Sequence, residues 1–232
     1  MGNYYGFDYM YLLIILSCVI ALIAQIKVKS TYSKYSRYGA SSGITGAQAA
    51  RQILQMNGIM DVTVEHVSGN LTDHYDPRHK VLRLSDSVYG SSSIAAIGVA
   101  AHECGHAIQH NVGYAPLQIR NSIVPAVNFA SSVSWFLILA GIIFSSSPFL
   151  VNLGIIMFSL TVLFQLITLP VEFNASGRAL AILSDSGMLY GDEVKGAKNV
   201  LSAAAMTYVA AAITAVLQLL RLIMIFGGRN ND

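Results

Sequence analysis

Two long apolar runs, Ile123–Phe144 (IVPAVNFASSVSWFLILAGIIF) and Phe149–Leu169 (FLVNLGIIMFSLTVLFQLITL), decide the fold class, and only four residues separate them. Each run has the roughly 20 residues that a helix needs to cross a lipid bilayer. Similar runs occupy Tyr9–Ile26 and Ala203–Phe226, although the last one carries Arg221 near its end. We therefore expect a mainly α-helical membrane protein with three to four transmembrane helices.

The composition of the 232 residues agrees with a membrane protein. Hydrophobic residues make up 54% of the chain and charged residues only 11%, whereas soluble domains carry about 25% charged residues. These values exclude a disordered chain, a coiled coil and a soluble monomer with an ordinary surface. The formal net charge of +2 offers nucleic acid no basic footprint, so no nucleic-acid partner is expected. With only Cys18 and Cys104, a disulfide scaffold is excluded as well.

Most lysines and arginines lie between the first two predicted spans, from Lys27 to Arg120. The positive-inside rule places this segment in the cytoplasm, so we expect a protein of the plasma membrane whose N-terminus lies outside. No basic residue precedes the first run, which we therefore interpret as an uncleaved anchor and not a signal peptide. The expected segments are a transmembrane anchor (1–26), a cytoplasmic α+β module (27–122), a transmembrane helical hairpin (123–169), a cytoplasmic helix (170–202) and a C-terminal transmembrane or interfacial helix (203–232).

The long segment between the first two spans has local structure of its own. Thr45 can cap a helix over Gly46–Asn57, and an Ala-rich helical pattern runs from Ser92 to His110. Three short segments between these helices read as strands, and the second is expected to pair back on the first; they are Val62–Val67, Leu71–Tyr75 and Lys80–Ser85. The last of them is either an edge that an extended substrate could join or an internal strand.

The Ala-rich helix contains the motif His102-Glu103-Cys104-Gly105-His106, an H-E-x-x-H pattern. Four residues advance a helix by about 6 Å and slightly more than one turn, so both imidazoles project from one face and can bind one Zn²⁺. Glu103 is rotated by about 100° from His102 and can act as a general base toward a water at the metal. Cys104 should face away and pack in the interior.

A catalytic zinc needs a third protein ligand. His110 is about 12 Å from His102 along the helix axis, too far to bind the same ion. Glu172 is the better candidate, because it follows Leu169-Pro170-Val171 at the end of the third span, where few other charges occur. It would hold the metal close to the membrane surface. An intramembrane protease with a metal-binding Asp is disfavoured, because the third and fourth spans contain no Asp.

The chain resembles the YugP-type membrane-embedded neutral zinc metallopeptidases, and more distantly the HtpX-type and prenyl-protein membrane proteases, over most of its length. The segments that carry the resemblance are Asp76–Ser85, Val88-Tyr89, Ser93–Ala96, Ala101–Gln109, Tyr114–Leu117 and Leu169–Phe173. The resemblance implies a zincin-like module with a gluzincin-like site and one Zn²⁺ per chain. Its metal ligands would be His102, His106 and Glu172, and its general base Glu103.

Other residues are candidates for supporting roles in such a site. Ser176 lies one helical turn after Glu172 and could hydrogen-bond near the metal. A donor that assists zinc in stabilising the oxyanion could be Arg178, His79 or Tyr114, and the sequence does not choose among them. After the Glu-Phe pair the family pattern leads us to expect an acidic and a basic residue, where this chain has Asn174 and Gly177. That departure concerns the support of the ligands more than the ligands themselves.

These observations predict a membrane-anchored zinc metalloendopeptidase that cuts a protein or peptide substrate, expected to be membrane-associated, at the cytoplasmic face. The alternative is a non-catalytic membrane scaffold or chaperone-like protein that retains a zinc site. Structural zinc usually has four protein ligands, often cysteines. The incomplete ligand set and the position of Glu103 therefore favour the enzyme. The sequence leaves the oligomeric state open.

Overall fold

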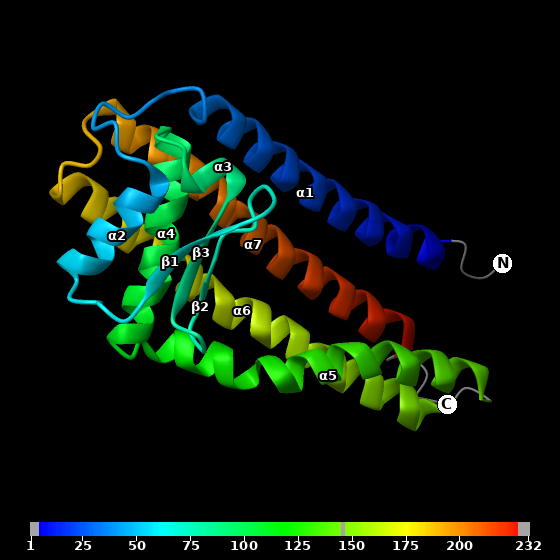
Figure 1. Ribbon diagram of the computed structural model, residues 1–232. Helices are drawn as coiled ribbons and strands as arrows, with labels where there is room; N and C mark the ends of the chain where they lie inside the picture. Colours follow the sequence, from blue (N-terminus) through cyan, green and yellow to red (C-terminus); the bar gives the residue numbers. More distant parts are fainter. Residues whose placement is uncertain (1–4, 145–146, 227–232) are drawn as a thin grey trace. The chain divides into compact units, whose positions relative to one another are not determined.

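Four long helices dominate the computed structural model, which describes residues 5–144 and 147–226 (Figure 1). All four are long and apolar enough to cross a membrane, and the prediction of a mainly helical architecture is confirmed. The predicted turn at 145–148 lies partly outside the described residues. The bounds of the long helices are Tyr5–Tyr35 (α1), Ala115–Ile143 (α5), Pro148–Asp185 (α6) and Asp192–Phe226 (α7).

Helix α6 differs from the expectation, because it continues through Pro170 to Asp185 without interruption. A separate helix was expected to begin at residue 170. Proline lacks a backbone N–H and costs a helix one hydrogen bond, yet apolar membrane helices tolerate it where neighbouring groups satisfy the freed carbonyl. Glu172 therefore belongs to the same continuous helix as the apolar residues that precede it.

The chain forms two compact units. In the first unit many large apolar side chains are exposed, and Phe136 and Phe149 each keep 73% of their surface accessible. Such exposure is expected of helices that face lipid, since a soluble protein rarely exposes so much contiguous apolar surface. The first unit comprises the described residues up to Ala24, 119–169 and those from Thr207 on, and the second comprises Gln25–Gln118 and Pro170–Met206.

Helix α2 (Gly46–Met56) of the second unit begins where the sequence predicted. Thr45 Oγ1 accepts a hydrogen bond from the backbone N–H of Gln48, and Gln48 Oε1 accepts one from the backbone N–H of Thr45. This reciprocal capping box satisfies two backbone donors that the helix itself cannot. The buried side chains of Ile53 and Leu54 form the face that packs against α4 (Ile94–Asn111).

A three-stranded sheet of β1 (Thr63–Val67), β2 (His74–Asp76) and β3 (Val81–Ser85) lies in the same unit, in the order β1-β3-β2. Strand β3 pairs parallel with β1 and antiparallel with β2. The prediction that the second strand pairs with the first is therefore wrong, because β3 lies between them. Strand β3 is also no free edge for a substrate, since both of its sides are occupied; four of its five residues are buried, as in a central strand.

Helix α4 is the central element of the second unit (Figure 1). Ser93 caps it by accepting a hydrogen bond from the backbone N–H of Ala96. A short helix α3 (Asp86–Tyr89), which the sequence reasoning missed, connects β3 to this cap. Contacts from α2, α3 and the sheet bury the Ala-rich side of α4. Small alanine side chains let these neighbours approach closely, so α4 is held rigidly where the H-E-x-x-H motif occurs.

Candidate metal centre

His102, His106 and Glu172, the three residues predicted as metal ligands, converge in the second unit. The two histidines come from α4 and the glutamate from α6. Glu172 Oε2 lies 3.3 Å from His102 Nε2 and 3.6 Å from His106 Nε2. Glu172 is only 2% exposed, and burying a carboxylate is costly unless it is paired with positive charge or coordinates a metal. The cluster of described residues therefore has the form of a cation site.

A glycine allows α4 and α6 to approach this closely. A Cβ added at Gly105 would lie 2.5 Å from the backbone carbonyl oxygen of Ala175 and 3.0 Å from its Cα. Only a residue without a side chain fits at that contact. Gly105 lies between the two histidines in α4, and Ala175 follows Glu172 by three residues in α6. The contact therefore sets the distance between the imidazoles and the carboxylate.

Each histidine has a partner at Nδ1, which leaves Nε2 directed at Glu172. His102 Nδ1 lies 3.1 Å from Ser176 Oγ, so the expected supporting role of Ser176 has a geometric basis. His106 Nδ1 lies 3.1 Å from Gln109 Oε1. When Nδ1 donates to such an oxygen, the lone pair of the imidazole is on Nε2, which is the form that binds a metal.

Gln109 is a supporting residue that the sequence reasoning missed. Its Nε2 donates to the backbone oxygen of Val171 at 2.8 Å and to Asn174 Oδ1 at 3.0 Å. Two acceptors fix the orientation of the amide, so Oε1 is the atom that faces His106. The available signal was its position three residues after His106, on the same side of the helix.

Asn174, the departure from the family pattern, belongs to this network. Its Oδ1 accepts hydrogen bonds from Gln109 and from Arg178 Nε, the latter at 2.8 Å. Asn174 thus links the helix that carries the two histidines to the helix that carries Glu172. Where the family pattern led us to expect an acidic residue, the neutral side chain of Asn174 forms these hydrogen bonds instead. The side chain of Arg178, a candidate oxyanion donor, is held by Asn174.

Glu103, the predicted general base, is 9% exposed and follows His102 directly in α4. Its carboxylate acts electrostatically on His106. Burial alone lowers the pKa of His106, but the contact with Glu172 and the charges of Glu103 and Glu172 outweigh burial and raise that pKa above its ordinary value. A cation that binds here has to displace a proton from the imidazole, so metal affinity falls at acid pH.

The other two predicted oxyanion donors, His79 and Tyr114, make no hydrogen bond to the three ligands among the described residues. His79 is exposed, and its Nδ1 contacts Asp76 Oδ2 at 2.7 Å. Tyr114 follows α4, where its backbone N–H bonds the oxygen of Gln109, and no hydrogen bond of its hydroxyl to the described cluster is found. His110, which its distance along the helix excludes as a ligand, is partly buried, and its Nδ1 lies 2.8 Å from the hydroxyl oxygen of Tyr75.

The prediction that Cys104 packs in the interior is confirmed. This residue is fully buried, and its Sγ contacts the backbone oxygen of Ala50 in α2 at 3.6 Å. Burial raises the pKa of the thiol well above its ordinary value. The thiol is therefore neutral and directed away from the histidines, and it does not compete as a ligand.

The residues present fit a zinc ion. Two imidazole nitrogens and one carboxylate oxygen all lie within 4.8 Å of one another, and this donor set is typical of catalytic zinc, which keeps a fourth position open. No cysteine among the described residues joins the three donors. The chemistry of the donors thus favours zinc over Mg²⁺ or Ca²⁺, which prefer oxygen ligands alone.

Comparisons with known proteins agree with this centre. The family model described as "Putative neutral zinc metallopeptidase" matches residues 10–227. The "Putative membrane protease YugP" of Bacillus subtilis (strain 168) is 54% identical over 210 residues, which cover 90% of this chain and 93% of that protein. No solved structure matches. Since the family model matches nearly the whole chain, the protein belongs to the neutral zinc metallopeptidase family.

Proposed function

We propose that the protein hydrolyses peptide bonds, with one zinc ion held by His102, His106 and Glu172 and with Glu103 as general base. The observation that carries this proposal is the convergence of both Nε2 atoms on the buried Glu172 carboxylate. A metal bound there supplies a Lewis acid that polarises the carbonyl of the substrate and acidifies water. The family membership and the membrane protease relative support the same reaction class.

The residues of the chain supply the proton transfers and the positioning. Glu103 takes a proton from the attacking water and later delivers it to the leaving amine, as a general base that becomes a general acid. Ser176 and Gln109 orient the two imidazoles through Nδ1. Arg178 is fixed by Asn174, which also accepts a hydrogen bond from Gln109, so Arg178 is linked to the side chain that contacts His106. We assign Arg178 to the role of oxyanion donor ahead of His79 and Tyr114.

The site lies at the cytoplasmic surface of the membrane in this proposal, and its substrates are membrane-associated proteins or peptides. Glu172 follows the apolar part of α6 within one turn of Thr168, which supports a position of the metal next to the bilayer. The basic residues from Lys27 to Arg120 favour a cytoplasmic second unit by the positive-inside rule.

A cysteine-labelling experiment tests the orientation. Met60 is 75% exposed in the second unit, so Met60→Cys in a Cys18→Ser background offers one reactive thiol, because Cys104 is buried. A membrane-impermeant maleimide should label this thiol only after the cells are opened. Labelling of intact cells would place the second unit outside.

The Glu103→Gln variant tests the catalytic role. The purified variant should keep the zinc content and melting temperature of the unmodified protein, but it should no longer cleave a library of quenched fluorescent peptides. Glu65→Gln, which changes an exposed carboxylate on β1, is the matched control and should retain cleavage. Full activity of Glu103→Gln would refute the base assignment. A zinc-loaded protein that cleaves no peptide, with or without Glu103, would favour a scaffold.

A further inference from the structure

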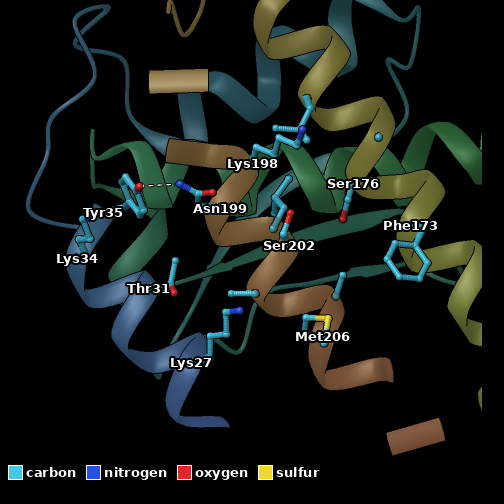
Figure 2. A pocket seen from close by; sticks show the side chains of 15 residues that line it. Lys27, Thr31, Lys34, Tyr35, Phe173, Ser176, Lys198, Asn199, Ser202 and Met206 are labelled. Carbon is cyan, nitrogen blue, oxygen red and sulfur yellow. Dashed lines mark hydrogen bonds between the residues drawn. The ribbon is translucent and has the colours of Figure 1, made fainter. Parts of the chain in front are cut away.

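A basic cavity of about 640 Å³ lies in the second unit, apart from the three metal ligands. Its walls come from α1, α6 and α7 (Figure 2). Three of the six lysines of the chain line it, and the lining contains no aspartate or glutamate. The lysines are Lys27, Lys34 and Lys198.

These lysines have no acidic partner within the described ranges. The lysine ion pairs found there join Lys80 to Asp61 and Lys195 to Asp192, and these residues lie outside the cavity lining. Lys34 has only its contact with the Tyr35 ring, 5.2 Å from its nitrogen to the ring centroid. Three ammonium groups around one cavity repel each other, and an anionic occupant would remove that repulsion. The charge of the cavity therefore selects an anion.

Hydrogen-bonding groups and apolar groups occupy the rest of the lining. Thr31 and Ser202 present hydroxyl groups, and Asn199 donates to the hydroxyl of Tyr35 at 2.8 Å (Figure 2). Phe173 and Met206 supply apolar surface, and both are about half exposed. An occupant that fits both the basic and the apolar parts of the lining carries an anionic polar group and an apolar body.

The sequence positions of the lining residues point to the boundary of the membrane. Lys27 is the first charged residue after the apolar run of α1, and Lys198 is the last charged residue before the apolar run of α7. A cavity built from both lies at the depth where lipid headgroups meet the protein. Basic pockets between membrane helices at this level bind anionic headgroups.

We propose that this cavity binds an anionic phospholipid, whose phosphate contacts Lys27, Lys34 and Lys198 and whose acyl chain packs on Phe173 and Met206. Lysine ammonium groups suit a phosphate as point charges that can adjust their positions. An acidic peptide would satisfy the lysines equally, but it leaves the apolar wall without a partner. The lipid binding goes beyond the proposed hydrolysis and does not depend on it.

Ser176 places the lipid close to the metal centre. Its side chain lines the cavity, and its Oγ lies 3.1 Å from His102 Nδ1. A single side chain thus links the wall of the cavity to a predicted metal ligand. A bound anionic lipid would contact α1, α6 and α7 and would hold these three helices together next to Ser176.

Native mass spectrometry of the detergent-purified full chain tests this inference. Phosphatidylglycerol and phosphatidylcholine with identical acyl chains are titrated separately, and glycerol 3-phosphate serves as the free headgroup. The cavity variant is Lys27→Gln, Lys34→Gln, Lys198→Gln. The matched control removes the other three lysines, by Lys29→Gln, Lys80→Gln and Lys195→Gln, and so has the same net charge. Melting temperature and zinc content establish that both triple variants fold.

Phosphatidylglycerol should bind the unmodified protein and the control, and phosphatidylcholine should bind more weakly. Binding should fall by about fivefold for each cavity lysine removed, from the contribution of one basic residue near an anionic lipid. The proposal would be overturned if both triple variants lost phosphatidylglycerol binding equally, or if the unmodified protein bound phosphatidylglycerol and phosphatidylcholine equally well. It would also be overturned if glycerol 3-phosphate saturated the protein at the same concentration as phosphatidylglycerol. Tighter lysine-dependent binding of an oligoglutamate peptide than of phosphatidylglycerol would assign the cavity to peptides instead.

Discussion

The contact between Gly105 and Ala175 gives the sharpest prediction of this structure. A Cβ at residue 105 would lie 2.5 Å from the Ala175 backbone oxygen, whereas real Cβ contacts essentially never fall below 3.0 Å. In Gly105→Ala the backbone of α6 must therefore retreat by at least about 0.5 Å. Backbone atoms cannot swing aside like the end of a flexible side chain, so the whole segment that carries Glu172 has to move.

This displacement should cost both stability and metal affinity. Overpacking of a close contact typically destabilises a protein by about 1–3 kcal/mol. Glu172 Oε2 lies 3.3 Å from His102 Nε2 and 3.6 Å from His106 Nε2. A movement of α6 by about 0.5 Å is therefore a substantial fraction of the spacing between the ligand atoms. We expect zinc affinity to fall by about 10- to 100-fold, as for loss of a residue that orients a metal ligand.

Gly177→Ala is the matched control for this substitution. It lies in α6 two residues after Ala175, and a Cβ there meets no atom within 4 Å. It should leave zinc affinity unchanged and can stabilise the helix by up to about 1 kcal/mol. The assay is chelator competition for zinc beside a thermal melt of both variants. Equal zinc affinity in the two variants would refute the view that the Gly105 contact sets the ligand spacing.

Two other predictions concern the hydrogen bonds around the site and the sheet. Gln109→Leu removes the donor to Val171 and Asn174 and should destabilise the protein by about 1–3 kcal/mol, with weaker zinc binding but unchanged helix content by circular dichroism. Asp76→Asn should lower the melting temperature near neutral pH, because hydrogen bonds led by that of His79 hold the pKa of Asp76 below its ordinary value. A lowered pKa stabilises the fold above the unfolded pKa of about 3.9, so this difference should shrink as the pH falls from there toward the folded pKa. A difference that grows toward acid pH would contradict that assignment.

Much of the candidate site could be predicted from local sequence. The H-E-x-x-H spacing alone places His102 and His106 on one face of a helix, because the helix period fixes it. The cap at Thr45 and the start of α2 follow from equally local chemistry. Glu172 could be proposed because a carboxylate after a long apolar run has few structural reasons to be there.

Other features depend on contacts between segments distant in the sequence. No sequence pattern within either strand indicates the parallel pairing of β1 with β3. The central position of β3 was therefore not predicted. The role of Gln109 requires Val171 and Asn174, which lie more than 60 residues away. The continuity of α6 through Pro170 depends on its surroundings, since proline by itself disfavours a helix interior.

The zinc content of the Glu172→Gln variant tests whether the buried glutamate is the third metal ligand. Asp185→Asn, an exposed carboxylate in the same helix, is the control, and both are measured beside the unmodified protein by atomic absorption after purification in detergent. We expect about one zinc per chain in the unmodified protein and in Asp185→Asn, and a large loss in Glu172→Gln. Zinc held as tightly by Glu172→Gln as by the unmodified protein would contradict the assignment of the buried glutamate as the third ligand.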